Sequence, residues 1–259
     1  MNDLSPQEQV ANDLSPQEQV ARGKVCLPLD GLHSLAGVRE LVEELSPFVG
    51  LFKIGKESFT RFGPEVVRLV HDHGAGVFLD LKYHDIPNTV KGAARAATEM
   101  GVSMFNVHAA GGLAMMKAAM EGVEEAASGP EGMPRVIAVT VLTSIDGEVL
   151  NQECGVPGPV EDQVLRLAKL TEAAGLHGIV CSAADMHALK GRLRSGFLFV
   201  TPGIKGTTTP AGEDQKRVLS PGRAIAAGSS LLVVGRAITG AANRRAAARE
   251  ILQDIAGVL

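Results

Sequence analysis

Short apolar runs recur along the chain from Lys24 onward, and longer stretches in which apolar residues repeat at helical spacing separate them. A short apolar run predicts a buried strand, and a three- and four-residue repeat predicts an amphipathic helix. Eight strands are predicted, at residues 24–29, 50–54, 76–81, 103–108, 135–142, 177–181, 197–201 and 231–235. The clearest helices are predicted at residues 35–45, 64–73, 87–100, 112–126, 160–174 and 237–257.

This alternation predicts an α/β fold, the (β/α)8 TIM barrel, in which each parallel strand is followed by a crossover helix. A doubly wound open sheet is the alternative, but the first strand lacks the GxGxxG turn that favours dinucleotide binding. We therefore expect residues 23–259 to form a single barrel domain.

The segment before the barrel contains a perfect duplication, because residues 2–11 recur unchanged as residues 12–21. The repeat is too short and too polar to stack as a structural repeat. Its Asp-Leu-Ser-Pro sequence is a helix-start signal, so each copy could form a short helix. The repeat could equally be a scar of gene duplication or cloning. We expect residues 1–22 to form a polar arm without chemistry.

Composition narrows the class of partner. The 259 residues are 45% hydrophobic, enough for a large core, and the formal net charge is −4. Trp is absent and Tyr occurs once, which leaves little for stacking on bases, so no nucleic-acid partner is expected. Three widely spaced cysteines without a CxxC pair predict neither a disulfide framework nor a zinc site. No apolar run is long enough to span a membrane, so we expect a soluble protein of the reducing cytoplasm.

Polar residues end several of the predicted strands: Asp30, Lys53, Asp80, Lys82, His108, Thr143, Ser182, Gly235 and Arg236. Any one of them could be an ordinary polar strand end. A barrel, however, gathers the carboxyl ends of its strands at one rim, where barrel enzymes have their active sites. The set therefore predicts one active site.

The densest group of charges follows the apolar run Val77-Phe78-Leu79 and reads DLKYHD from Asp80 to Asp85. Side chains two residues apart on a strand share a face, so Asp80 and Lys82 are expected to point the same way. Opposite charges a few ångströms apart favour each other's ionised form. A surface ion-pair cluster and a fixed electrostatic device in a catalytic site both fit this pattern.

The longer string DxKxxDIPNT resembles the signature of the orotidine 5'-monophosphate decarboxylase family. Further motifs support the resemblance, which extends from Val25 to about Thr239: Leu29-Asp30, Phe52-Lys53-Ile54-Gly55, VTVLTS at residues 139–144, TPGI at residues 201–204 and Gly235-Arg236. The resemblance implies a catalytic network of Lys53, Asp80, Lys82 and Asp85. It also implies a homodimer with shared active sites, in which Asp85 and Thr89 come from the partner subunit.

The resemblance implies a second group of residues, which bind the substrate: Asp30, Thr89, Thr143, Pro202, Lys205, Gln215, Gly235 and Arg236. Asp30 would bind the ribose, Thr143 the pyrimidine and Arg236 the phosphate. Lys205 stands where arginine is common in the family. The lysine keeps the positive charge but lacks the bidentate guanidinium fork. The loop from Gly203 to Gln215 has the composition of a mobile lid.

The activity implied is decarboxylation of orotidine 5'-monophosphate to uridine 5'-monophosphate, with Lys82 as electrostatic stabiliser and proton donor at C6. No pyridoxal, thiamine or flavin motif is present, so neither cofactor nor metal is expected. Two alternatives stay open: a magnesium-dependent sugar-phosphate decarboxylase or aldolase on the same barrel, and a barrel that binds a nucleotide without catalysis.

Overall fold

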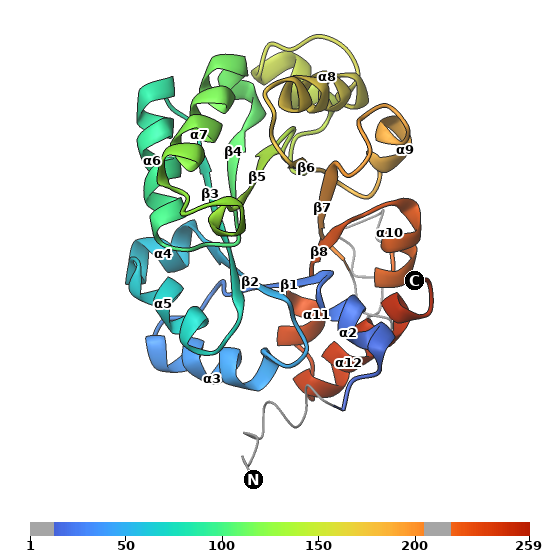
Figure 1. The fold of residues 1–259 in the computed structure, drawn as a ribbon. Helices are drawn as coiled ribbons and strands as arrows, with labels where there is room; N and C mark the ends of the chain where they lie inside the picture. The colour runs from blue at the N-terminus through green and yellow to red at the C-terminus, as the bar shows by residue number, and fades with distance from the viewer. Residues whose placement is uncertain (1–12, 205–218) are drawn as a thin grey trace. The chain divides into compact units, whose positions relative to one another are not determined.

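The computed structural model describes residues 13–204 and 219–259, and its parallel strands close into a barrel in the order β1 to β8 (Figure 1). The predicted (β/α)8 fold is therefore confirmed. The strands are β1 (Val25–Pro28), β2 (Leu51–Gly55), β3 (Gly76–Tyr83), β4 (Met104–His108), β5 (Arg135–Val139), β6 (Gly178–Val180), β7 (Leu198–Pro202) and β8 (Leu231–Val233).

Helices separate the strands along the chain. They are α2 (Pro16–Arg22), α3 (Leu35–Leu45), α4 (Lys56–Phe62), α5 (Glu65–Asp72), α6 (Pro87–Glu99), α7 (Gly112–Ala126), α8 (Val160–Ala173), α9 (Met186–Leu189), α10 (Pro221–Ala227), α11 (Arg236–Thr239) and α12 (Arg244–Ala256). Short 3-10 or π turns occur at Ala109–Gly111, Pro130–Gly132 and Val149–Glu153.

Contacts divide the described chain into two compact units. The first contains the described residues up to Phe78 and those from Pro202 onward. Within it, β1 pairs with β2 and with β8, all in parallel, and Pro28 aligns with Lys53. Pro28 is the last residue of β1, and the N–H of Leu29 beyond it still donates to the carbonyl of Lys53 at 2.9 Å.

The second unit runs from Leu79 to Thr201. In it β4, β5, β6 and β7 pair in parallel, and the register puts His108, Val139, Val180 and Val200 at one level. The residues that follow this level therefore lie together at the carboxyl ends of the strands. In the same unit, α6 and α7 pack closely along each other (Figure 1).

Buried apolar side chains hold the helices against the strands. In the second unit, Val164 of α8 and Leu189 of α9 pack with Ile179 of β6, and all three are fully buried. Since each fully buried aliphatic side chain stabilises the fold by roughly 1.5–3 kcal/mol, such clusters supply most of the favourable free energy of folding.

Two predicted elements need correction. The helix expected at residues 237–257 is broken into α11 and α12, because the Asn243 side chain accepts a hydrogen bond from the N–H of Ala246 at 3.0 Å and begins a new helix. The strand expected at residues 135–142 ends at Val139, and Thr140 is the first residue beyond it.

The second copy of the duplication provides α2, the short helix that its start signal allows. Ser15 and Glu18 form a capping box, and Leu14 and Ala21 are buried. This helix packs on α12 within the first unit (Figure 1). The first copy lies outside the described residues. No helix in the described part of the chain is long and apolar enough to cross a membrane.

Candidate active site

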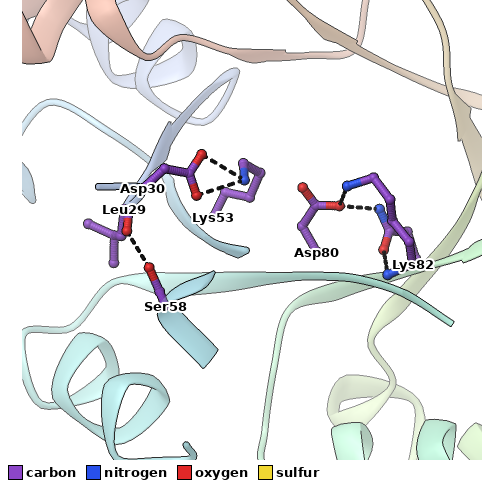
Figure 2. A network of polar contacts seen from close by, with 7 residues as sticks. Leu29, Asp30, Lys53, Ser58, Asp80 and Lys82 are labelled. Atoms are coloured by element: carbon purple, nitrogen blue, oxygen red, sulfur yellow. Dashed lines mark hydrogen bonds and ion pairs between the residues drawn. The ribbon is translucent and has the colours of Figure 1, made fainter. Parts of the chain in front are cut away.

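The first unit presents an ion pair where β1 and β2 end. Lys53 Nζ lies 3.3 Å from Asp30 Oδ2 (Figure 2). The Lys53 side chain is 11% exposed and that of Asp30 is 52% exposed, so the ammonium is enclosed while the carboxylate faces outward. A carboxylate held in this way can accept hydrogen bonds from a ligand's hydroxyl groups.

Neighbouring residues explain why the pair fits there. A Cβ atom on Gly55 would come within 2.8 Å of Asp30 Oδ1 and 3.1 Å of Lys53 Nζ, so a larger residue would displace the ends of these two side chains. The buried Ser58 hydroxyl, from the first turn of α4, donates to the carbonyl of Leu29 (Figure 2). This bond ties α4 to the segment that carries Asp30.

The same unit holds the end of β8 close to the end of β1. A Cβ atom on Gly235 would come within 3.1 Å of Pro28 Cγ, which favours glycine at this approach. Arg236 follows as the first residue of α11 and is exposed. Its guanidinium is therefore available to an anion at the carboxyl ends of the strands.

The second unit presents the other charged group, at the end of β3. Lys82 Nζ forms an ion pair with Asp80 Oδ1 (Figure 2). Asp80 is only 8% exposed. Asn106 of β4 adds a second donor, because its Nδ2 donates to the same Asp80 oxygen at 2.7 Å. These two donors offset the desolvation of the buried carboxylate.

Lys82 has an unusual backbone conformation. Its φ is 55°, and it is the only residue other than glycine with positive φ in the described chain. A left-handed conformation strains a residue with a Cβ atom by about 1–3 kcal/mol. The N–H of Lys82 donates to Asn106 Oδ1 at 2.8 Å, which helps to hold this conformation. The strain is located at the residue that carries the ammonium.

Aromatic and imidazole side chains surround the end of β3. The Tyr83 ring packs on Phe105 at 5.9 Å between centroids, and burial raises the pKa of Tyr83 to about 12. The phenol is therefore neutral at physiological pH. The rings of His84 and His108 lie 5.6 Å apart at the ends of β3 and β4.

Asp85 lies beyond the strand, in the segment that leads into α6, and Thr89 lies in the first turn of α6 itself. Both are exposed, and Asp85 Oδ1 accepts a hydrogen bond from the N–H of Ile86 at 2.7 Å. Ile86 itself is 68% exposed. The structure thus pairs Asp80 with Lys82 and leaves Asp85 on an accessible surface.

Of the remaining residues predicted to bind the substrate, some lie in the described part of the chain and others lie outside it. Thr143 is exposed in the loop after β5, and Pro202 is the last residue of β7. Lys205 and Gln215, with the loop predicted to be a lid, lie outside the described residues. Within the described ranges, no three His, Cys, Asp or Glu side chains are grouped so that they could hold a metal ion.

Sequence reasoning missed Asn106. The signal that could have found it is an amide in an otherwise apolar strand, MFNVH, where it is 1% exposed. A buried amide requires hydrogen-bond partners. For Asn106 they are the carboxylate of Asp80 and the backbone N–H of Lys82, both on the neighbouring strand β3.

A parallel barrel with lysine–aspartate pairs at the carboxyl ends of its strands belongs to the class of barrel enzymes whose active site lies at that end. Comparison with known proteins narrows this class. The sequence profile of the Orotidine 5'-phosphate decarboxylase / HUMPS family matches residues 23–251, and the chain belongs to this family.

Individual relatives agree. The chain is 49% identical to the orotidine 5'-phosphate decarboxylase of Moorella thermoacetica over 236 residues, which cover 91% of this chain and 93% of that protein. It is 47% identical to the protein of the same name from Syntrophus aciditrophicus, over 90% of this chain and 93% of the relative. The crystal structure of orotidine 5'-phosphate decarboxylase from Lactobacillus acidophilus matches with a TM-score of 0.79 at 35% identity, and the match covers 90% of this chain and 99% of that one.

Proposed function

We propose that this protein decarboxylates orotidine 5'-monophosphate to uridine 5'-monophosphate, a step in pyrimidine biosynthesis. The observation that carries the proposal is the ion pair of Asp80 and Lys82 at the end of β3. It occurs in a chain whose relatives are named for this activity.

The reaction needs a positively charged group beside the carbon atom that loses CO2. Loss of CO2 from C6 of the pyrimidine leaves an electron pair there, and the ammonium of Lys82 would stabilise this developing carbanion. The same ammonium would then donate its proton to C6. The carboxylate of Asp80 would face the substrate's carboxylate, so that repulsion between them is relieved when CO2 leaves. In this mechanism the protein's own charges replace a cofactor.

Lys53 and Asp85 complete the proposed charge network. Lys53 is enclosed and paired with Asp30 at 3.3 Å, which supports a fixed position for its ammonium. Asp30 is the partly exposed member of this pair, and we assign it to the ribose hydroxyls.

The rest of the substrate would be bound by residues from the ends of later strands. We assign Thr143 to the pyrimidine and Arg236 to the phosphate, because a guanidinium fork matches phosphate oxygens. The other residues that we assign to substrate binding are Pro202, Lys205, Gln215 and Gly235. Binding energy at the phosphate, far from C6, can be used to lower the barrier at the reacting carbon.

We further propose a homodimer in which Asp85 and Thr89 enter the partner's active site. Their exposure beside the exposed Ile86 supports this arrangement. Mixing inactive Lys82→Ala protein with inactive Asp85→Ala protein should then restore about a quarter of wild-type activity, since random exchange leaves one native site in each mixed dimer. Absence of any recovery after subunit exchange would contradict shared sites.

Residues 23–259 are proposed to act as one catalytic domain in the cytoplasm, with neither membrane nor nucleic acid as a partner. Cell fractionation that recovers the protein with membranes, or nuclease treatment that changes its elution volume, would contradict this assignment.

The activity can be tested directly. Purified protein is incubated with orotidine 5'-monophosphate and excess EDTA, and the change from the orotate to the uracil chromophore is followed. Rapid turnover that EDTA does not affect supports the proposal. Turnover of sugar phosphates with magnesium, and none of orotidine 5'-monophosphate, would favour the metal-dependent alternative. Binding of uridine 5'-monophosphate without any turnover would favour the non-catalytic one.

A further inference from the structure

We propose that Asn106 is a positioning residue for this reaction, in that its amide fixes the carboxylate of Asp80 and the backbone of Lys82 relative to each other. This inference rests on the proposed function, since it assigns Asn106 a role through the two residues proposed to act on the substrate. Asn106 itself is not assigned any contact with the substrate.

The geometry uses both ends of one amide. Asn106 Nδ2 donates to Asp80 Oδ1 at 2.7 Å, and Asn106 Oδ1 accepts from the N–H of Lys82 at 2.8 Å. The orientation of the amide is fixed by chemistry, because a carboxylate oxygen requires a donor and a backbone N–H requires an acceptor. An ionised aspartate, a leucine or a serine side chain cannot reproduce this pair of bonds.

The bond to Asp80 restrains the carboxylate. Asp80 Oδ1 accepts hydrogen bonds from both the amide of Asn106 and the ammonium of Lys82. Rotation of the carboxylate about its Cβ–Cγ bond would lengthen the hydrogen bond from the Asn106 amide. Because Asn106 is 1% exposed, a water molecule does not readily replace this hydrogen bond. The direction from which the carboxylate meets the ammonium is thereby set by Asn106.

The bond to Lys82 restrains the main chain. With φ at 55°, Lys82 is in a conformation that a residue with a Cβ atom leaves easily, and the hydrogen bond from its N–H to Asn106 opposes that change. Because φ determines where the lysine side chain starts, this bond also sets the reach of the ammonium. A displacement of this kind lowers the rate of a reaction that depends on placement.

A merely structural role for a buried amide predicts a different outcome. It predicts a lower free energy of unfolding, with kcat and its pH dependence unchanged. The positioning role predicts a fall in kcat with little change in KM, because the groups assigned to the ribose and phosphate lie elsewhere.

The first test is Asn106→Leu, which keeps the number and branching of the side-chain heavy atoms and removes both hydrogen bonds. We expect kcat for orotidine 5'-monophosphate to fall by about 10- to 100-fold while KM stays within about threefold, the loss typical of a hydrogen bond to a charged group. The matched control is Thr171→Val, since Thr171 is 0% exposed and its hydroxyl donates to the carbonyl of Leu167 at 2.8 Å in α8. The control should lose stability and keep kcat.

The second variant is Asn106→Asp, which keeps the shape and the acceptor. Only its protonated carboxyl can donate to Asp80, and a neighbouring carboxylate favours that protonated form. The ratio of its kcat to that of the wild type should therefore fall by about tenfold or more as pH rises from about 5.5 to about 8.5. A ratio independent of pH would overturn the proposal, as would an unchanged kcat in Asn106→Leu.

The two proposals fail separately. If the wild-type protein does not decarboxylate orotidine 5'-monophosphate, the proposed function fails before any variant is compared. If the wild type is active and Lys82→Ala is not, but both Asn106 variants keep the wild-type kcat and pH profile, then only the role of Asn106 is contradicted.

Discussion

Lys82 combines strain and charge in a single residue. Its φ of 55° is unfavourable for a side chain with a Cβ atom, and its ammonium pairs with a carboxylate that is itself buried. Strained backbone of this kind persists where the surrounding structure holds it in place, and it occurs often at functional sites. At Lys82 the hydrogen bond to Asn106 provides part of that support.

The strain at Lys82 can be measured by comparing two substitutions that both remove the ammonium. Lys82→Gly should have a free energy of unfolding about 1 kcal/mol higher than Lys82→Ala, because glycine adopts positive φ without a steric penalty. Urea denaturation of both variants measures the difference. The same pair at Arg135, an exposed residue of β5 without positive φ, should show the opposite order. A Lys82→Gly variant less stable than Lys82→Ala would show that φ is not strained in solution.

At the residue scale, the sequence predicted the charged residues of the site better than its neutral polar residues. Asp80 and Lys82 stand out in an apolar context, and even spacing on a strand predicted that they would meet, as they do. The left-handed conformation of Lys82 could not be predicted, because it depends on an acceptor 24 residues away. Asn106 could be recognised only once its neighbouring strand was known.

At the scale of elements, the apolar runs predicted all eight strands, since buried parallel strands have few polar interruptions. The helices expected at residues 35–45 and 112–126 have these bounds in the structure. The short helices α4 and α10 were not predicted, because seven residues give too little periodicity to distinguish a helix from a loop. The break before α12 was not predicted, because the apolar residues repeat at helical spacing across it and the capping role of Asn243 does not interrupt that pattern.

The duplicated segment allows a clean test of one element. Deletion of either copy gives the same sequence, which retains the residues that form α2. We expect this single-copy variant to melt within about 2 °C of the parent, because it keeps the sequence that forms α2 and its buried leucine and alanine. Deletion of residues 2–21 removes the buried Leu14 and Ala21 and should lower Tm by about 4–8 °C, equivalent to about 2 kcal/mol. Equal melting temperatures for the parent and the variant without either copy would contradict a stabilising role for α2.

At the scale of the whole molecule, stability should depend on His177. Its Nδ1 accepts the N–H of Val136 at 3.0 Å, which requires an unprotonated nitrogen, and burial lowers the pKa of His177 below 6.5. The nearby Arg135 lowers it further. Because the unfolded chain then binds the proton more readily than the folded one, the free energy of unfolding is highest above pH 6.5 and falls as pH decreases toward the folded pKa.

The substitution His177→Asn keeps an acceptor near the position of Nδ1 and removes the titration. Urea denaturation between about pH 7.5 and about pH 5 should show a smaller loss of stability in this variant than in the wild type. His71, whose pKa burial also lowers, accounts for part of the remaining slope. Identical pH dependence in wild type and variant would contradict the role of His177.

The central claim is that the ammonium of Lys82 carries out the chemistry at C6. The most direct measurement is kcat/KM for orotidine 5'-monophosphate, in excess EDTA, for the wild type, Lys82→Ala and the control Lys117→Ala, whose lysine is exposed on α7. We expect Lys82→Ala to lose about 10⁴-fold or more while its circular dichroism spectrum is unchanged, and Lys117→Ala to match the wild type. A folded Lys82→Ala protein with activity close to that of the wild type would contradict the mechanism.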